Sequence, residues 1–137
     1  MTAFTDRKDI CIALVAARIT GTRPEDFRDF TEGDPPYTID NLYRFLAHHH
    51  IRMGLNFIFD EPERIDLNRL YVTGLGPIGA CEAVLTVAVG SMPRHCIYFD
   101  GASVYDPIYR DRPTPPVSRY RVRFWSPIFR MEQVPRP

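Results

Sequence analysis

The stretch RHCIYFDGASVYDP, residues 94–107, places a turn signal between two short apolar runs. Asp-Gly flanked by alternating apolar residues is the strongest local signal for a two-residue hairpin loop, so Asp100 and Gly101 are expected to join two antiparallel strands. A loop of this length pairs His95 with Asp106 across the hairpin. Opposed residues share one face with Cβ atoms about 5 Å apart, so the sequence predicts that these two side chains touch.

A histidine-aspartate pair across two strands has two interpretations. It could be a solvated pair that stabilises the hairpin by a few tenths of a kcal/mol. It could also be half of a catalytic site, because the rest of its face is apolar and a partly desolvated ionisable pair costs free energy unless its members satisfy each other. A third reactive group beside the pair would favour the catalytic interpretation.

Along the rest of the chain, the spacing of apolar residues changes once, from a helical to a strand-like period. Three helical segments come first, at 9–20, 22–30 and 38–50; Asp9 is the expected cap of the first, and Gly21 follows its end. Short β-branched or aromatic runs then lie between Gly, Pro and Asp signals, at 53–59, 69–74, 83–90, 95–99, 103–106 and 119–129. Helices followed by strands predict an α+β fold with N-terminal helices packed on an antiparallel sheet.

Composition limits the class of protein further. A chain of 137 residues that is 45% hydrophobic can form one sizeable core, so we expect a single domain over residues 1–137 with 126–137 as a loosely ordered tail. Seventeen basic and 17 acidic residues give no net charge, which argues against a nucleic-acid partner. No apolar run reaches the roughly 18 residues of a membrane span, and the first residues lack a signal-peptide core. The expectation is a cytoplasmic protein without a membrane partner.

The cysteines supply a candidate for the third group. Cys11, Cys81 and Cys96 are odd in number and lack CxxC spacing, so neither a disulfide framework nor a zinc site is indicated. Cys11 lies in the first turn of the predicted 9–20 helix, where the helix field and a nearby imidazolium would favour its thiolate. If the hairpin docks on this helix, Cys11 is the nucleophile, His95 the base and Asp106 the group that orients the imidazole.

Other interpretations of the thiols remain open. Cys11 could be a small apolar residue of a buried helix, as most free cysteines are. Cys96 is the neighbour of His95, but strand alternation sends the two side chains to opposite faces. Cys81 has no predicted base beside it.

No metal and no cofactor are expected. The run of three histidines at 48–50 ends a predicted helix, and adjacent helical residues diverge by about 100°, so a solvated helix end is the expected role. Gly74, Gly76 and Gly79 do not have the spacing and the following helix of a dinucleotide-binding loop.

Longer stretches resemble a known family. CIALVAARITGTRPEDF, residues 11–27, resembles the opening of small papain-like cysteine peptidases of the bacteriocin-processing type and their phage-encoded relatives, which have a glycine ten positions after the cysteine. NLYRFLAHHHIRMGL (41–55) and VGSMPRHCIYFDGASVYDP (89–107) are similar to later parts of the same proteins, in the same order. The resemblance implies a papain-like fold in which Cys11 is the nucleophile, His95 the general base and acid, and Asp106 the orienting carboxylate.

The chain departs from this family in two places. Such peptidases have a glutamine about six residues before the cysteine, which donates to the oxyanion, whereas the only glutamine here is Gln133. The second His-Pro pair found around the Asp-Pro motif in many phage relatives is also missing. Loss of one oxyanion donor typically costs about 10²–10³ in rate, although the backbone N–H of Cys11 remains.

Two functions follow as expectations. The first is a phage-encoded thiol hydrolase, peptidase or acyltransferase that acts on a peptide or another acyl-bearing substrate, such as a host protein. The second is a papain-like protein without activity that binds and inhibits a host protein. The segment SRYRVRFWSPIF, residues 118–129, favours the second if its aromatic and arginine side chains are exposed, because Tyr, Trp and Arg dominate binding hot spots. Simple alternation instead places Arg119, Arg121 and Arg123 outward on a final strand, with Tyr120, Val122 and Phe124 inward.

Overall fold

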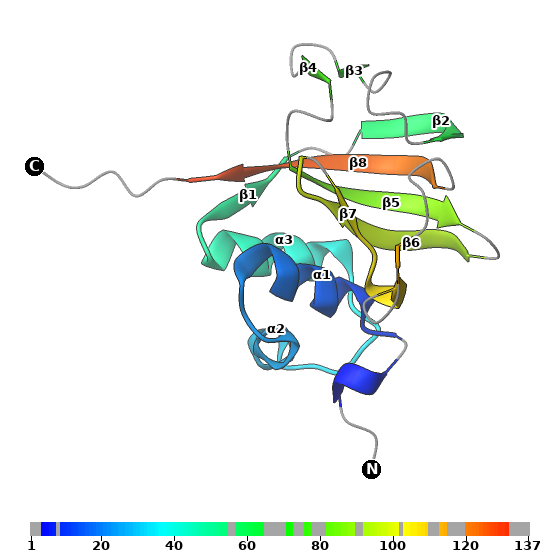
Figure 1. The fold of residues 1–137 in the computed structure, drawn as a ribbon. Helices are drawn as coiled ribbons and strands as arrows, with labels where there is room; N and C mark the ends of the chain where they lie inside the picture. Colours follow the sequence, from blue (N-terminus) through cyan, green and yellow to red (C-terminus); the bar gives the residue numbers. More distant parts are fainter. Residues whose placement is uncertain are drawn as a thin grey trace, which may run out of the picture.

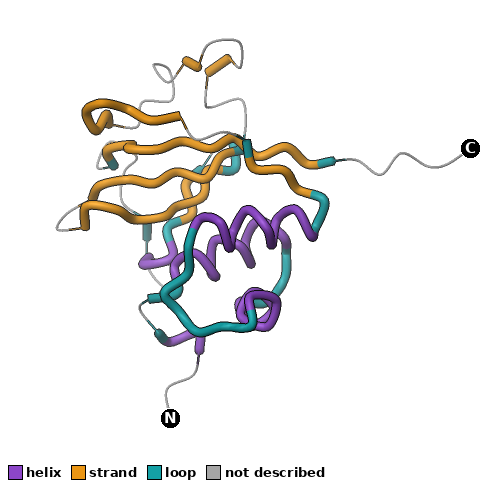
Figure 2. The backbone as a smooth tube through the Cα atoms, turned by 180° about the vertical axis from the view of Figure 1, so that it is seen from behind, coloured by secondary structure: helices purple, strands orange, loops and turns teal. Residues whose placement is uncertain are grey.

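The described residues of the computed structural model form a layer of helices on one side of an antiparallel sheet (Figure 1). These residues are 4–7, 9–54, 57–64, 71–72, 76–77, 82–89, 92–101, 103–109, 113–114 and 120–131. The view from behind shows the same two layers, with the helices grouped together beneath the strands (Figure 2). The predicted α+β class is therefore confirmed. Gly74, Gly79, Cys81 and Arg119, on which expectations were placed, lie outside the described residues.

The helical layer follows the predicted order. A 3₁₀ turn, η1 (Phe4–Asp6), precedes α1 (Cys11–Thr20), α2 (Pro24–Thr31) and α3 (Ile39–His48). Gly21 ends α1 with a left-handed φ of 70°, as its position predicted. Thr38 caps α3 by accepting a hydrogen bond from the Asn41 N–H at 3.1 Å. None of the helices in the described ranges is long and apolar enough to cross a membrane.

The sheet is antiparallel, with the order β1-β8-β5-β6-β7 and with β2 also paired to β8. Its strands are β1 (Ile51–Met53), β2 (Phe57–Arg64), β5 (Ala83–Val89), β6 (Met92–Phe99), β7 (Val104–Tyr105) and β8 (Arg121–Arg130); β3 (Tyr71–Val72) and β4 (Gly76–Pro77) form a separate pair. The single strand predicted at 53–59 is thus two strands on either side of Gly54. A Cβ on Gly54 would lie 3.0 Å from the Pro127 side chain, so the absence of a side chain lets the two backbones approach.

The hairpin of β6 and β7 has a different register from the predicted one. Phe99 pairs with Val104 and Tyr98 with Tyr105, so four residues separate the strands instead of two. Asp100 closes this longer turn: its N–H donates to the Ser103 carbonyl at 3.1 Å, and its carboxylate accepts from the Ser103 N–H at 2.7 Å. The prediction of a two-residue loop was therefore wrong, because the side chain of Asp100 stabilises a competing turn.

The last strand is longer than predicted. β8 continues to Arg130, and Ser126 and Ile128 are buried, so the expectation of a loose tail from residue 126 was wrong for residues 126–130. Arg130 makes two hydrogen bonds of 2.8 Å to Glu82 and donates to the Ile19 carbonyl at 3.0 Å. This arginine therefore ties the end of the sheet to the C-terminal turn of α1.

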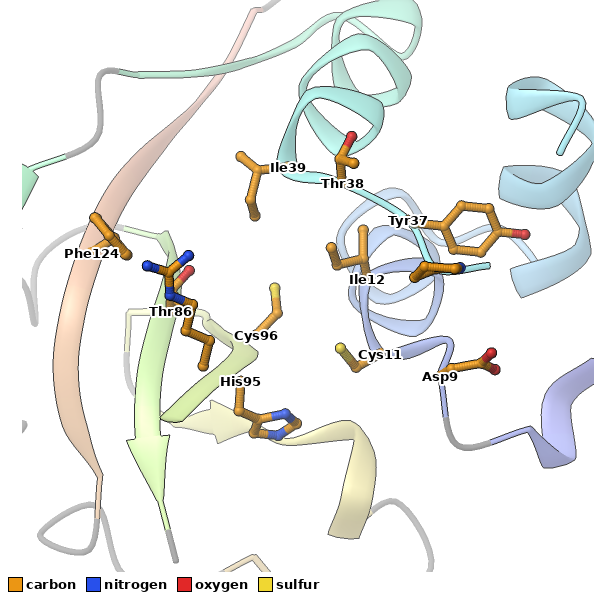
Figure 3. Close-up of a pocket in the computed structure, with 12 residues that line it drawn as sticks. Asp9, Cys11, Ile12, Tyr37, Thr38, Ile39, Thr86, His95, Cys96 and Phe124 are labelled. Carbon is orange, nitrogen blue, oxygen red and sulfur yellow. The ribbon is translucent and has the colours of Figure 1, made fainter. Parts of the chain in front are cut away.

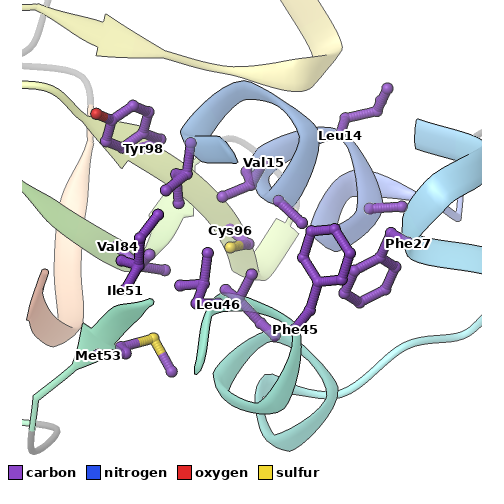
Figure 4. Packing of buried hydrophobic residues seen from close by; sticks show 14 of the residues in the cluster. Leu14, Val15, Phe27, Phe45, Leu46, Ile51, Met53, Val84, Cys96 and Tyr98 are labelled. Atoms are coloured by element: carbon purple, nitrogen blue, oxygen red, sulfur yellow. The ribbon is translucent and has the colours of Figure 1, made fainter. Parts of the chain in front are cut away.

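The main core lies between the helices and the sheet (Figure 4). In it Phe27 packs edge-on against Tyr37 and Phe45, with ring centroids 4.8 and 5.1 Å away. Cys96 and Tyr98 of β6 belong to this core. Ile97 and Phe99, which alternate with them, have no exposed surface, so residues 95–99 of β6 are buried on both faces.

The aromatic residues near the start of β8 are also buried. Tyr120 and Trp125 have no exposed surface, whereas Arg121 is exposed and Val122 is buried, as simple alternation predicted. The alternation is interrupted where the pairing with β5 shifts between Thr86 and Val87. Tyr120 and Trp125 therefore offer no surface to a partner, whereas Phe129 near the end of the same segment is 46% exposed.

Candidate active site

Cys11 is the first residue of α1 and is partly exposed with a free thiol. The predicted capping by Asp9 was wrong, because Arg7 binds both carboxylate oxygens of Asp9, at 3.0 and 2.8 Å. Ile10 is the N-cap residue, and no side chain caps the helix. The first intrahelical hydrogen bond runs from the Leu14 N–H to the Ile10 carbonyl at 3.0 Å. Within the part of the chain that the structure describes, no side chain caps the N–H groups of this first turn.

His95 and Asp106 form the predicted contact. The His95 Nε2 lies 2.6 Å from the Asp106 Oδ1, and the two residues are only 5% and 1% exposed. The shift of the hairpin by two residues preserved this contact, because a shift by an even number leaves each side chain on its original face. Asp106 follows β7 directly and precedes the 3₁₀ turn η3 (Pro107–Tyr109), which packs against α1.

Two further groups hold the Asp106 carboxylate in place. The Tyr120 hydroxyl donates to Oδ2 at 2.7 Å, and the Ile108 N–H donates to Oδ1 at 3.0 Å. Burial by itself would raise the pKa of Asp106, but the hydrogen bonds from His95 and Tyr120 lower it below its ordinary value. Asp106 is therefore an ionised carboxylate at neutral pH. Tyr120 had been placed inward on the last strand, but no local signal joined it to a residue 14 positions earlier.

His95 is held as an imidazolium. Burial by itself would lower its pKa, but the hydrogen bond to Asp106 and the interaction with Cys11 outweigh burial and raise the pKa from 6.5 to about 9. With Nε2 bound to Asp106, Nδ1 is the ring nitrogen left for the Cys11 thiol. The three predicted residues are thus brought together in the order thiol, imidazole, carboxylate.

Cys11 and His95 open into one pocket of about 470 Å³ between the helical layer and the sheet (Figure 3). In this view the two side chains face the same space, with the His95 ring below Cys11. The pocket is walled by the first turn of α1, the segment that enters α3, and residues of β5, β6 and β8: Asp9, Cys11, Ile12, Pro36, Tyr37, Thr38, Ile39, Thr86, Arg94, His95, Cys96 and Phe124. Its volume is in the range of small-ligand sites.

The other predicted features lie outside the reactive centre. Cys96 belongs to the core and also lines the pocket, and burial raises the pKa of its thiol well above the ordinary value. At the end of α3, the ring of His48 contacts that of Phe30 and the ring of His49 contacts that of Phe45, both in tilted arrangements. Within the described ranges, no three His, Cys, Asp or Glu side chains come together as a group that could hold a metal ion.

No protein-family model, curated protein or solved structure matches this chain. The fold and the site define an α+β protein in which a partly exposed cysteine, a buried histidine and a buried aspartate lie together beside a pocket. Sequence reasoning had found these three residues. It had missed Tyr120, and it had not assigned any residue to the wall of the pocket.

Proposed function

We propose that this chain is a papain-like thiol hydrolase, with peptidase or acyltransferase chemistry, in which Cys11 is the nucleophile. The observation that carries the proposal is the position of His95 between the Cys11 thiol and the buried Asp106 carboxylate, at the wall of a pocket. A surface hairpin pair would not need a buried carboxylate with two further donors. The chemistry of the three groups in this order is that of an activated nucleophile.

The first step is attack by the thiolate. The imidazolium of His95 stabilises the Cys11 thiolate, whose sulfur attacks a carbonyl carbon of the substrate. A carbon–sulfur bond forms and the carbonyl π pair moves to oxygen. The uncapped N–H groups at the start of α1 are suitable donors to this oxyanion, and the positive end of the helix dipole favours it. These N–H groups would replace the oxyanion-donating glutamine that the resembled peptidases have before the cysteine and that this chain lacks there.

The remaining steps move one proton through His95. Its imidazolium gives a proton to the leaving amine or alkoxide as the tetrahedral adduct collapses to a thioester on Cys11. The neutral imidazole then takes a proton from water or from an acceptor amine, which attacks the thioester. Collapse of the second adduct then breaks the carbon–sulfur bond and releases the Cys11 thiolate beside His95, which is already an imidazolium again. Asp106 keeps the ring oriented and stabilises its charge during both transfers.

The family resemblance suggests where this chemistry takes place and on which class of substrate. Its members are bacterial and phage-encoded peptidases, so the proposed site of action is the bacterial cytoplasm and the proposed substrate class is a peptide or another acyl-bearing molecule of the host.

Alkylation kinetics test the proposal. Purified protein is treated with iodoacetamide between pH 5.5 and 9, and modification of Cys11 is followed by peptide mass spectrometry in the wild type, His95→Ala and the control His49→Ala. An imidazolium-supported thiolate reacts rapidly at pH 6, and His95→Ala should slow this reaction by at least about tenfold, while His49→Ala leaves it unchanged. Slow labelling that rises only toward pH 8–9, as for free thiols, and that is the same in all three proteins would overturn the proposal.

The second candidate is a papain-like protein that binds a host protein without catalysis. It is favoured by one observation, the absence of a glutamine before Cys11. An activated ester such as p-nitrophenyl acetate separates the candidates. A thiol hydrolase releases more than one equivalent of nitrophenol per protein and loses this release on Cys11→Ala. A non-catalytic protein gives the same slow release in the wild type and in the variant.

A further inference from the structure

The pocket beside Cys11 carries one charge without an opposite partner. Its walls are mostly apolar or hydroxyl-bearing, and outside the catalytic residues its charged side chains are those of Asp9 and Arg94. Asp9 is bound by Arg7 through two hydrogen bonds. Among the residues that the structure describes, Arg94 takes part in no ion pair. The pocket therefore presents an uncompensated guanidinium.

The position of this guanidinium is restrained. Its carbon lies 5.8 Å from the centroid of the Phe124 ring, which also lines the pocket. A cation over an aromatic face is attracted by the ring quadrupole, so Phe124 keeps the charge at the wall. Arg94 also directly precedes His95 in β6, and both residues line the same pocket as Cys11. A planar guanidinium in such a place is suited to bidentate recognition of a carboxylate.

We propose that Arg94 makes the pocket selective for acyl substrates that carry a carboxylate close to the carbonyl that Cys11 attacks. The carboxylate is either the side chain of an Asp or Glu or a free chain terminus; the apolar walls formed by Ile12, Ile39 and Phe124 receive the carbon skeleton that bears it. This inference rests on the proposed function because it names the substrate class of the same site. It concerns binding, however, and can be tested without turnover.

Charged alkylating probes provide the test. N-iodoacetyl-glutamate α-amide presents a side-chain carboxylate, N-iodoacetyl-glutamine presents a terminal carboxylate, and N-iodoacetyl-glutamine amide is their neutral match. Second-order rate constants for modification of Cys11 by each are measured in the wild type. The same rates are measured in Arg94→Gln, Arg94→Glu, Arg94→Lys and Arg52→Gln, in which Arg52 is an exposed arginine of β1 that does not line the pocket.

The expected result is a preference of the wild type for one or both anionic probes over the neutral one. Arg94→Gln should reduce this preference by about three- to fivefold, which is the effect expected when a partly exposed ion pair is lost. Arg94→Glu should reduce it further. Arg94→Lys should retain part of it, and Arg52→Gln all of it. The preference should also fall in 0.5 M NaCl because salt screens exposed charges. The favoured probe identifies the source of the carboxylate.

Failure of this inference and failure of the proposed function give different results. Equal anionic-to-neutral ratios in the wild type, Arg94→Gln and Arg94→Glu would overturn the role of Arg94, even if labelling is fast and depends on His95. Labelling by iodoacetamide that is slow and insensitive to His95 would instead overturn the catalytic role of Cys11. Loss of the preference in Arg52→Gln as well as in Arg94→Gln would show that the preference comes from the overall charge of the surface. This result would also overturn the inference.

Discussion

At the scale of single residues, Asp106 decides the state of the site. Its carboxylate is bound by His95, by the Tyr120 hydroxyl and by a backbone N–H, and each of these donors favours its ionised form. An ionised, buried carboxylate in turn keeps His95 protonated. In the proposed mechanism this charge on His95 stabilises the thiolate of Cys11, so Asp106 acts on the nucleophile through His95.

Asp106→Asn should return the titration of His95 toward that of an ordinary histidine. The amide has nearly the same shape but carries no charge, so the pKa of His95 should fall from about 9 toward 6.5 or below. The measurement is a ¹H–¹³C NMR titration of the histidine ring signals. His49, whose pKa burial lowers below 6.5, is the internal control and should not move. A His95 signal that titrates at the same pH in both proteins would contradict this account.

At the scale of elements, the β6–β7 hairpin positions the pair. The expected two-residue loop and the observed four-residue loop differ in register by two, which is one full period of a strand. A difference of one residue would have moved Asp106 to the opposite face from His95. The contact was therefore predicted correctly from an incorrect turn, because alternation is a stronger constraint than loop length.

Gly101→Ala should destabilise the protein through this turn. Gly101 has φ 103°, a conformation that residues with a Cβ rarely adopt, so the substitution should lower the free energy of unfolding by about 1 kcal/mol or more. Gly33→Ala is the matched control, because its backbone is not in that region and the nearest atom to an added Cβ is 3.8 Å away. Urea denaturation at pH 7 compares the two. Equal loss of stability in both variants would contradict the explanation.

At the scale of the whole molecule, the site exists only where the two layers meet. Cys11 comes from the first turn of the helical layer, His95 from a strand, Asp106 from the loop after β7 and Tyr120 from the entry to β8. The pocket lies at the same junction. Ionisation of the site is therefore coupled to the stability of the complete fold.

The stability of the fold should fall on the alkaline side of neutrality. The pKa of His95 is about 9 in the folded state and about 6.5 when unfolded, so its contribution is complete below pH 6.5 and is lost as the pH rises through 9. The pKa of Asp106 is lowered, so its contribution is present above about pH 4 and is lost as the pH falls below that. Between pH 6.5 and 9.5 the free energy of unfolding should drop by roughly 2–3 kcal/mol.

Urea denaturation at pH 5, 6.5, 8 and 9.5 measures this profile. Asp106→Asn is the comparison, because it keeps the thiols, whose ionisation also affects stability at high pH, but lacks the charge that raises the pKa of His95. The variant should show a clearly smaller drop between pH 6.5 and 9.5 than the wild type. Parallel profiles in the two proteins would contradict the coupling.

The sequence by itself determined the order of helices and strands, the shared face of His95 and Asp106, and the choice of Cys11, His95 and Asp106 as candidate site residues. These features depend on periodicity and turn chemistry, which act over a few residues. The limits of elements were less predictable where side chains competed locally: Asp100 closes a longer turn, Asp9 binds Arg7 instead of capping α1, and Gly54 divides a strand.

Only the tertiary structure decided which distant groups meet. It placed Tyr120 on Asp106, Arg94 and Phe124 on the wall of the pocket, and the first turn of α1 beside His95. None of these contacts has a local signal, because each joins segments whose approach is set by the packing of the helices on the sheet. The charge states of the site follow from the same packing, since burial and hydrogen bonding between distant residues raise the pKa of His95 and lower that of Asp106.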